Sequence, residues 1–264
     1  MLHQKNAVIY GAAGSLGSAV SKALAEAGAT VYLTGRTETA LRQLADVITS
    51  NGGNAFVHVV DAMDDAAINN HLELVITQGG KVDISFNLAG IDVIQDIPLV
   101  ELSVKDYVEP VTKTLHTRFL TATAAARRMM QQGSGVILSL TATPGGIGYP
   151  FTAGFAAACT ALENFSQNLA SEVGPYGVRV VNIRSGGSPD SAVFKDALKA
   201  YPDLMPALLS SMEKDTMLKK LPPMTDIANV AVFLSSHFAA SITGVTIDVT
   251  AGTTAALNYR SARK

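Results

Sequence analysis

The chain has 264 residues, of which 48% are hydrophobic and 16% charged, with a net charge of −2 at pH 7. This composition describes one large, well-buried α/β domain rather than a disordered protein. A near-neutral charge excludes the phosphate backbone of nucleic acid as a partner. A single cysteine excludes an internal disulfide, and no apolar run is long enough to span a membrane. The first six residues are too few for a signal peptide, so we expect a cytoplasmic protein. Five scattered histidines give no metal-ligand spacing, so we expect no metal.

A glycine-rich turn follows a short apolar run at residues 7–10, and a helical pattern continues from it to about residue 28. The turn contains Gly11, Gly14, Ser15, Leu16 and Gly17. In such a turn, free N–H groups and the positive end of a helix dipole face an anion such as a pyrophosphate. Glycine-rich turns also occur where a helix simply packs close to a strand. The place of this turn at the start of a strand–helix–strand unit favours a phosphate cradle.

Strands and helices alternate along the rest of the chain. The further predicted strands are residues 30–34, 55–60, 82–86, 136–140, 178–183 and 245–249. The further predicted helices are residues 37–50, 65–78, 103–132, 152–173 and 226–236. Residues 188–224 hold five of the ten prolines and are predicted to be irregular. The alternation predicts right-handed crossovers and one doubly wound domain over residues 1–264, with a mostly parallel seven-stranded sheet and ligand sites beyond the carboxyl ends of its strands.

These landmarks resemble the short-chain dehydrogenase/reductase family over nearly the full length of the chain. Members of that family have a Rossmann fold and transfer hydride to or from a nicotinamide cofactor. Asp61 resembles the aspartate that holds the adenine ring, and Ser191 falls where the family places a hydroxyl against the nicotinamide amide. Further similar positions are Asn87, Ala89 and Gly90 of an Asn-Asn-Ala-Gly element, Gly187 in a turn after the sixth strand, and residues 242–244 before the last strand.

Arg36 decides the expected cofactor. Members that prefer NAD end the second strand with an acidic residue, whereas this chain has Thr34, Gly35 and Arg36. A guanidinium there can hold a 2′-phosphate with two hydrogen bonds, so we expect NADP in preference to NAD. The alternative is an ordinary exposed arginine at the start of a helix. Ser15 departs from the glycine that is commonest in the family's turn, and it either crowds the pyrophosphate or bonds to it.

The catalytic positions differ from those of the resembling family, which uses an asparagine, a serine, a tyrosine and a lysine. At these positions the chain has Thr114, Ala142, Phe155 and Cys159. The spacing of four residues still puts Phe155 and Cys159 on one helix face. However, phenylalanine has no proton to give, and a neutral thiol cannot supply the positive charge of a lysine. The resemblance therefore implies a site without the family's usual carbonyl mechanism.

Four side chains near this site are candidate replacements. Thr141 and Thr143 carry hydroxyls, either of which could orient a substrate, and Tyr149 is the nearest phenol in the sequence. For each, an ordinary role at a strand end or in a loop is the better interpretation. Cys159 is either a nucleophile near a helix N-terminus or a small packing residue, and its alanine neighbours favour packing.

The two long predicted helices suggest how copies of the chain associate. Their small residues are Ala122, Ala124, Ala125, Ala126, Ala156, Ala157, Ala158 and Ala161. The resembling family forms its oligomer interface on these helices, which implies a homodimer or homotetramer. The same alanines could instead face the sheet of their own subunit. Residues 188–224 correspond to the family's substrate lid and hold half of the methionines, which suits a hydrophobic ligand or plain core packing.

Three functions remain open. The first is an NADP-dependent oxidoreductase with a substitute acid, or with an activated alkene or imine as its substrate. The second is a catalytically silent relative that binds nucleotide or ligand as a sensor or partner subunit. The third is a non-redox lyase, isomerase or cyclase. We place the oxidoreductase first, acting on a hydrophobic small molecule, because the cofactor half of the site is maintained.

Overall fold

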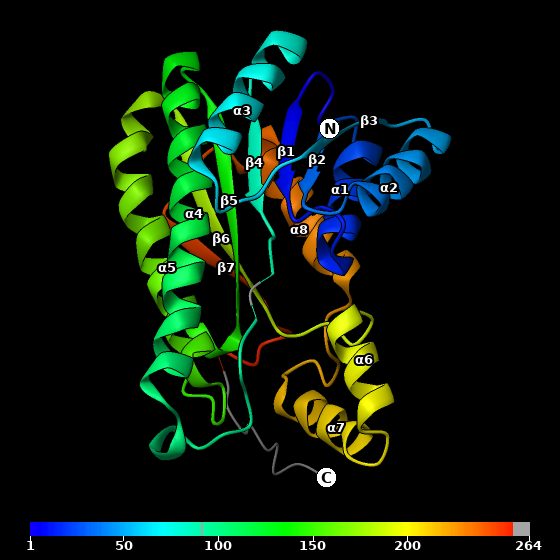
Figure 1. Ribbon diagram of the computed structural model, residues 1–264, viewed down its shortest axis with the longest axis vertical. Helices are drawn as coiled ribbons and strands as arrows, with labels where there is room; N and C mark the ends of the chain where they lie inside the picture. The colour runs from blue at the N-terminus through cyan, green and yellow to red at the C-terminus, as the bar shows by residue number, and fades with distance from the viewer. Residues whose placement is uncertain (91, 256–264) are drawn as a thin grey trace.

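A sheet of seven parallel strands runs through the computed structural model, which describes residues 1–90 and 92–255 (Figure 1). The strands are β1 (Asn6–Tyr10), β2 (Thr30–Gly35), β3 (Asn54–Val59), β4 (Ile84–Asn87), β5 (Gly135–Ala142), β6 (Val178–Ser185) and β7 (Val245–Val249). Their order is β3-β2-β1-β4-β5-β6-β7, and every neighbouring pair is parallel. The predicted doubly wound sheet is confirmed. The strand order reverses direction between β1 and β4, where ligands bind in sheets of this kind.

Helices cover both faces of this sheet. In the described residues they are α1 (Ser15–Glu26), α2 (Glu38–Ser50), α3 (Asp65–Gly79), α4 (Val104–Gln132), α5 (Ala153–Val173), α6 (Ala192–Ala200), α7 (Met205–Asp215) and α8 (Met224–Ser235). Helices α1, α2 and α8 share one core cluster with the strands, and α3, α4 and α5 share the other. Figure 1 shows these two groups on opposite sides of the sheet. No helix of the described ranges is both long and apolar enough to cross a membrane.

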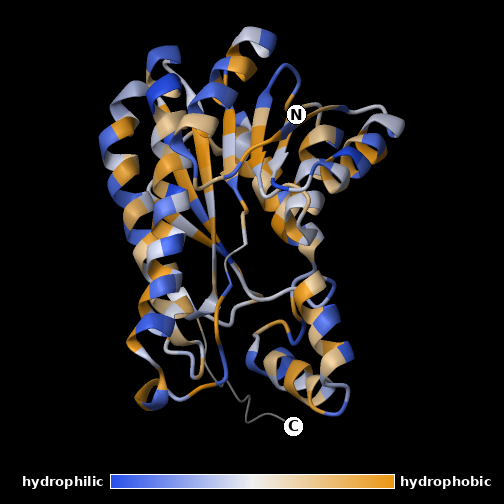
Figure 2. Cartoon of the chain, viewed as in Figure 1, coloured by the Kyte–Doolittle hydropathy of each residue, from blue (hydrophilic) through white to orange (hydrophobic). Residues whose placement is uncertain are grey.

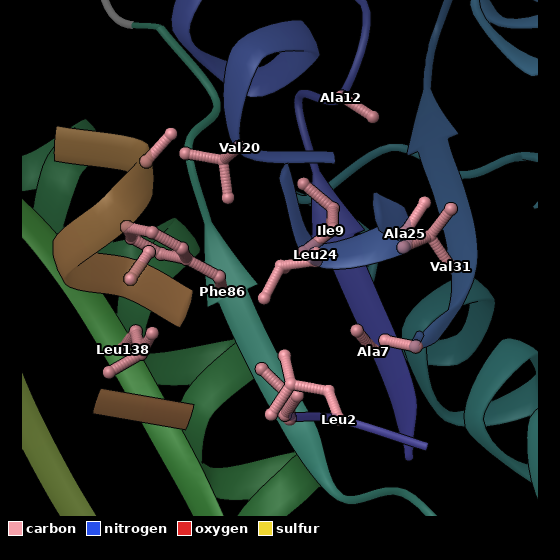
Figure 3. Packing of buried hydrophobic residues seen from close by; sticks show 14 of the residues in the cluster. Leu2, Ala7, Ile9, Ala12, Val20, Leu24, Ala25, Val31, Phe86 and Leu138 are labelled. Carbon is pink, nitrogen blue, oxygen red and sulfur yellow. The ribbon is translucent and has the colours of Figure 1, made fainter. Parts of the chain in front are cut away.

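The central strands are buried on both faces, as parallel strands are when helices cover them. All five residues of β1 are buried, and Figure 2 shows hydrophobic residues concentrated on these strands. Figure 3 shows Val20 and Leu24 of α1 beside Ile9 of β1 and Phe86 of β4, and none of these four side chains is exposed. This packing fixes the start of α1 at the carboxyl end of β1.

The predicted helix starts at residues 65 and 103 are confirmed by their caps. The Asp64 carboxylate accepts a hydrogen bond of 3.0 Å from the Ala67 N–H, and Ser103 Oγ accepts one of 3.1 Å from the Asp106 N–H. These bonds satisfy N–H groups that have no acceptor inside the helix. The other predicted strands and helices agree with the structure to within one or two residues at most ends.

Residues 188–224 were predicted to be irregular, and this prediction is wrong. The segment contains α6 and α7, which Figure 1 shows beyond the carboxyl ends of the strands. Its prolines do not prevent helices because they stand outside them or, like Pro206, in the first turn of α7. A proline in the first turn costs no hydrogen bond, since that N–H has no acceptor inside the helix.

The alanines of α4 do not form a free surface. Ala122, Ala124, Ala125 and Ala126 are all buried in the core cluster of their own subunit. Of the alanines on α5, Ala158 is also buried, whereas Ala156, Ala157 and Ala161 are half-buried. For the α4 residues, the alternative that the alanines face their own sheet is the correct one.

Candidate functional site

Gly11 and Gly17 build a turn in which only glycine fits. Gly11 has a φ of +71°, and a Cβ on it would lie 2.6 Å from Cα of Ala89. A Cβ on Gly17 would overlap the carbonyl oxygen of Gly11. Gly14 has more room, since a Cβ there would lie 3.3 Å from the same oxygen. The missing side chains bring α1 directly against the end of β1 and leave an open backbone surface.

The N-terminus of α1 presents unpaired N–H groups at this surface. Helix α1 begins at Ser15, and its N-cap is Gly14, which has no side chain to cap it. The first turn also contains no acidic residue. The first N–H groups of a helix have no acceptor within it, and here no carboxylate competes for them. The arrangement fits the pyrophosphate of a dinucleotide, because both the N–H groups and the helix dipole favour an anion.

Ser15 joins this turn to α6. Its Oγ accepts a hydrogen bond of 3.2 Å from the N–H of Ala192, the first residue of α6. Ser191 is the N-cap of α6, and its side chain makes no capping bond. Two helix N-termini therefore meet at the Ser15 hydroxyl, and the segment predicted to be a lid is in contact with the phosphate cradle.

Arg36 and Asp61 lie at the carboxyl ends of the adjacent strands β2 and β3. Both residues are exposed. The nearby carboxylate of Glu38 is held by Arg42, whose Nε lies 2.9 Å from it. The Asp61 carboxylate accepts a bond of 3.0 Å from the Met63 N–H. The structure thus brings the predicted 2′-phosphate and adenine residues to the same edge of the sheet as the glycine turn.

Asn87 holds the turn of residues 87–90 from beneath. It is buried, and its Nδ2 donates to Oγ1 of Thr121 at 3.0 Å and to the carbonyl of Thr117 at 3.2 Å. Its Oδ1 accepts a bond of 3.0 Å from the Ala89 N–H. Asn87 therefore positions Ala89 and Gly90. Gly90 itself has open space around it.

Ser188 and Gly187 follow β6 at the same edge. Gly187 has a φ of +85°, and a Cβ there would lie 3.2 Å from the Phe194 ring and 3.4 Å from Met212. Ser188 is only 6% exposed, yet within the described ranges its buried Oγ has no hydrogen-bond partner. A buried hydroxyl without a partner is costly, and a bound polar ligand would remove that cost. Sequence reasoning singled out Gly187 and missed Ser188.

The four catalytic positions of the resembling family come from three elements. Ala142 ends β5, Thr114 lies on α4, and Phe155 and Cys159 lie one turn apart on α5. Cys159 is 4% exposed, and burial raises the pKa of its thiol to about 11. The thiol is therefore neutral near pH 7. This favours the packing interpretation of Cys159 over a nucleophile.

Thr141 is already committed to a buried polar network. Its Oγ1 donates to Oε1 of Glu163 at 2.7 Å and accepts from Nδ2 of Asn182 at 2.7 Å. Glu163 in turn pairs with Arg184, whose Nε lies 3.0 Å from Oε1, and Arg184 also pairs with Asp248 at 2.6 Å. The single proton of Thr141 is thus donated to Glu163. We did not predict this network. Its signal in the sequence was the presence of charged residues, Glu163 and Arg184, within the apolar stretches of α5 and β6.

Tyr149 lies in the loop before α5 and is half-buried. Burial raises the pKa of its phenol, and the negative charge of Asp215 at the end of α7 raises it further. A phenol with a raised pKa is a weaker acid near neutral pH. The environment of Tyr149 therefore gives no help to a proton-donating role.

Arg118 contacts the turn of residues 87–90, a contact that sequence reasoning missed. It lies on α4, one turn after Thr114, and only 8% of it is exposed. Its Nη2 donates to the carbonyl of Ala89 at 2.9 Å, which connects α4 to the turn of residues 87–90. The sequence did contain a signal for this contact, since Arg118 is a charged residue on the same helix face as Thr114.

A shallow groove of about 550 Å³ lies between α4 and α5. It is lined by Leu115, His116, Phe119, Ala161, Asn164, Phe165 and Asn168. Phe119 is 53% exposed, and its ring centroid lies 5.9 Å from that of Phe165. The groove is an apolar surface on the two helices that were predicted to form an oligomer interface.

Comparisons with known proteins cover almost the whole chain. A family model described as enoyl-(acyl carrier protein) reductase matches residues 11–254. The chain is 30% identical to the 3-oxoacyl-(acyl-carrier-protein) reductase FabG of Escherichia coli K12, over 94% of this chain and 96% of that protein. It is 28% identical to the 7alpha-hydroxysteroid dehydrogenase of the same organism, with 97% of each covered. The solved structure of sorbitol-6-phosphate 2-dehydrogenase SrlD from Erwinia amylovora matches with a TM-score of 0.86 at 27% identity, over 94% of this chain and 98% of that chain.

Proposed function

We propose, since the chain belongs to the short-chain dehydrogenase/reductase family, that it is an NADP(H)-dependent oxidoreductase with a non-standard reacting site. One observation carries the proposal: the glycine turn, Arg36 and Asp61 stand at the same carboxyl edge of the sheet, and Gly14, Arg36 and Asp61 are exposed there. At the positions of the family tetrad the side chains are instead Thr114, Ala142, Phe155 and Cys159. The residues expected to bind the cofactor thus resemble those of the family, whereas the residues expected to transfer a proton differ from them.

The chain's own residues divide the binding of NADP(H) between them. The N–H groups at the start of α1 would hold the pyrophosphate, and Arg36 the 2′-phosphate. Asp61 would hold the adenine, and Ser188 and Ser191 would face the nicotinamide end. When bound, the cofactor supplies or accepts a hydride.

The substrate that fits this site is a hydrophobic small molecule, preferably an activated alkene. Leu204, Leu208 and Met217 are exposed, which provides apolar surface on the segment that corresponds to the family's substrate lid. An activated alkene needs less help with protonation than a ketone, and this suits a site with Phe155 in place of a tyrosine. Support also comes from relatives whose names refer to acyl and steroid substrates, and from the enoyl reductase description of the family.

A fluorescence titration with NADPH and with NADH tests the proposal. We expect tight NADPH binding by the unmodified protein, and a dissociation constant about 10- to 100-fold larger in Arg36→Ala, because a charge-assisted bond to the 2′-phosphate is lost. NADH binding should change little in this variant. The matched control is Arg127→Ala, which removes an exposed arginine on α4. If neither nucleotide binds at millimolar concentration, the oxidoreductase proposal fails and a ligand-sensing or non-redox role takes its place.

We also propose that the protein is a homodimer or homotetramer that buries the groove between α4 and α5. The exposed ring of Phe119 supports this, because an apolar groove gains free energy when a second copy covers it. Sedimentation analysis of the purified protein is the measurement. A monomer at micromolar concentration would contradict this assembly.

A further inference from the structure

Arg118 is a buried cation without an anionic partner among the residues that the structure describes. Its Nη1 donates to Oγ1 of Thr117 and its Nη2 to the carbonyl of Ala89, both at 2.9 Å. Both acceptors are neutral oxygens. Its Nε is buried and has no acceptor in the described part of the chain.

A comparison with Arg184 shows how unusual this is. The Arg184 side chain is 13% exposed and forms ion pairs with the carboxylates of Glu163 and Asp248. Arg118 forms none within residues 1–90 and 92–255. Burial lowers the pKa of Arg118 to about 10, so the guanidinium is still positively charged near pH 7. A charge buried without a counter-charge costs several kcal/mol, and a bound anion would offset that cost.

The position of this cation ties it to the site. The Ala89 carbonyl that binds Arg118 belongs to the residue whose backbone lies against Gly11 of the phosphate cradle. Helix α4, which carries Arg118, packs against α5, the helix that carries Phe155 and Cys159. The guanidinium is therefore bonded to the turn beside the cradle, and it comes from a helix that packs against α5. In the resembling family α5 carries the lysine, whereas here the buried positive charge stands on α4.

We propose that Arg118 binds the negatively charged oxygen that forms on the substrate during hydride transfer. This inference rests on the proposed function and names a residue for it. When the β-carbon of a conjugated carbonyl compound gains a hydride, the electron pair of its carbon–carbon double bond moves toward the carbonyl, and the oxygen becomes an enolate. The substrate is reduced by two electrons, and the nicotinamide is oxidised by two.

The enolate needs a cation more than it needs an acid at its oxygen. Arg118 stabilises the oxygen charge, and the α-carbon then takes a proton from water, with hydroxide left to the buffer. An alkoxide formed from an isolated ketone would instead require a proton at the oxygen, which neither Phe155 nor Arg118 provides. The charge on Arg118 and the loss of the phenol at position 155 are thus consistent with one substrate class, the conjugated carbonyl compounds.

Binding of 4-nitrophenol in the presence of saturating NADP+ tests this role without requiring the natural substrate. Its anion is delocalised like an enolate and absorbs visible light, whereas the neutral phenol does not. We expect the protein to bind the anion, so that the pKa of the bound phenol falls below that of the free phenol. In Arg118→Met, the dissociation constant of the anion should rise about 10- to 100-fold, since a hydrogen-bonded charge is lost. Arg118→Lys keeps the charge and should recover part of the affinity.

The controls separate this proposal from the proposed function. Arg127→Met removes an exposed arginine from the same helix and should leave 4-nitrophenol binding unchanged. NADPH titration of Arg118→Met, together with its thermal unfolding, reports whether the variant is folded and still binds nucleotide. Three results would overturn the proposal. The first is that Arg118→Met binds the anion as tightly as the unmodified protein does. The second is that the unmodified protein prefers the neutral phenol, and the third is that it binds NADPH normally but does not bind 4-nitrophenol at millimolar concentration. Failure of NADPH binding in the unmodified protein would instead overturn the proposed function.

Discussion

The phosphate cradle and the reacting end of the site lie at the same edge of the sheet but are held by different interactions. The cradle depends on space, because Gly11 and Gly17 leave no room for a side chain. The reacting end depends on charge, because Arg118 of α4 is buried against the Ala89 carbonyl, and Arg184 of β6 forms a largely buried ion pair with Glu163 of α5. A substitution that adds a side-chain carbon should therefore destabilise the cradle. A substitution that removes one member of an ion pair should destabilise the reacting end.

The largest expected effect comes from breaking the buried pair at the reacting end. Arg184→Met leaves the Glu163 carboxylate buried without its cation, which should lower the free energy of unfolding by about 3–5 kcal/mol. Urea unfolding of the purified variant measures this. The double variant Arg184→Met with Glu163→Gln removes both charges while keeping an acceptor for Thr141, and it should recover much of the loss. A double variant no more stable than Arg184→Met alone would show that the pair matters only through packing.

In the cradle, Gly17→Ala should lower the free energy of unfolding by about 1–3 kcal/mol, because its Cβ overlaps the Gly11 carbonyl and forces α1 away from β1. The same displacement should weaken NADPH binding, measured by titration of the folded variant. Gly148→Ala is the matched control, since nothing lies within 4 Å of its added carbon. Equal stability and equal NADPH affinity for the two variants would contradict the assigned role of Gly17.

A smaller, pH-dependent effect is expected from His71, which lies on α3 behind the cradle half. Burial lowers its pKa to about 3, and neither ring nitrogen has a hydrogen-bond partner in the described ranges. The folded state therefore holds His71 neutral, while the unfolded chain binds a proton below about pH 6.5. Stability is complete above that pH and decreases as the pH falls toward 3, by about 2 kcal/mol between pH 7 and pH 5.

Urea unfolding at both pH values, with His71→Leu as the comparison, isolates this contribution. The variant has no proton to bind at this position, so its stability should decrease by about 2 kcal/mol less than that of the unmodified protein. Identical pH dependence of the two proteins would mean that His71 is not the group responsible.

The part of the site that depends on local backbone was readable from the sequence. Glycine spacing predicted the turn at the start of α1, and strand ends predicted the positions of Arg36 and Asp61 in the fold, because each is fixed by its immediate neighbours in the chain; their binding roles stay predictions. Arg118 could not be found in this way. Its significance depends on a contact with the Ala89 carbonyl, 29 residues away, and on the lack of a carboxylate partner within residues 1–90 and 92–255. Neither feature is encoded in a local pattern.

Most of the fold was predictable for a similar reason, because local patterns mark its strands and helices. The exception is the segment of residues 188–224. Alternating apolar runs and capping residues identified the parallel sheet and the helix starts at residues 65 and 103. The helices within residues 188–224 were missed because prolines were interpreted as breaking the whole segment. Pro206 instead stands in the first turn of α7, where a proline is compatible with a helix. For predicting whether a segment is helical, the position of each proline relative to a helix start is more informative than the number of prolines.

The most direct test of the account is a crystal structure of the protein with NADP+. We predict the pyrophosphate against the N–H groups at the start of α1, the 2′-phosphate on Arg36, and the nicotinamide ring on the side of the Ala89 turn where Arg118 lies. In such a structure, the glycine turn and the Arg118 guanidinium would both lie around the same bound cofactor. A crystal grown with saturating NADP+ that shows no nucleotide at this edge, or a nucleotide whose 2′-phosphate lies away from Arg36, would contradict it.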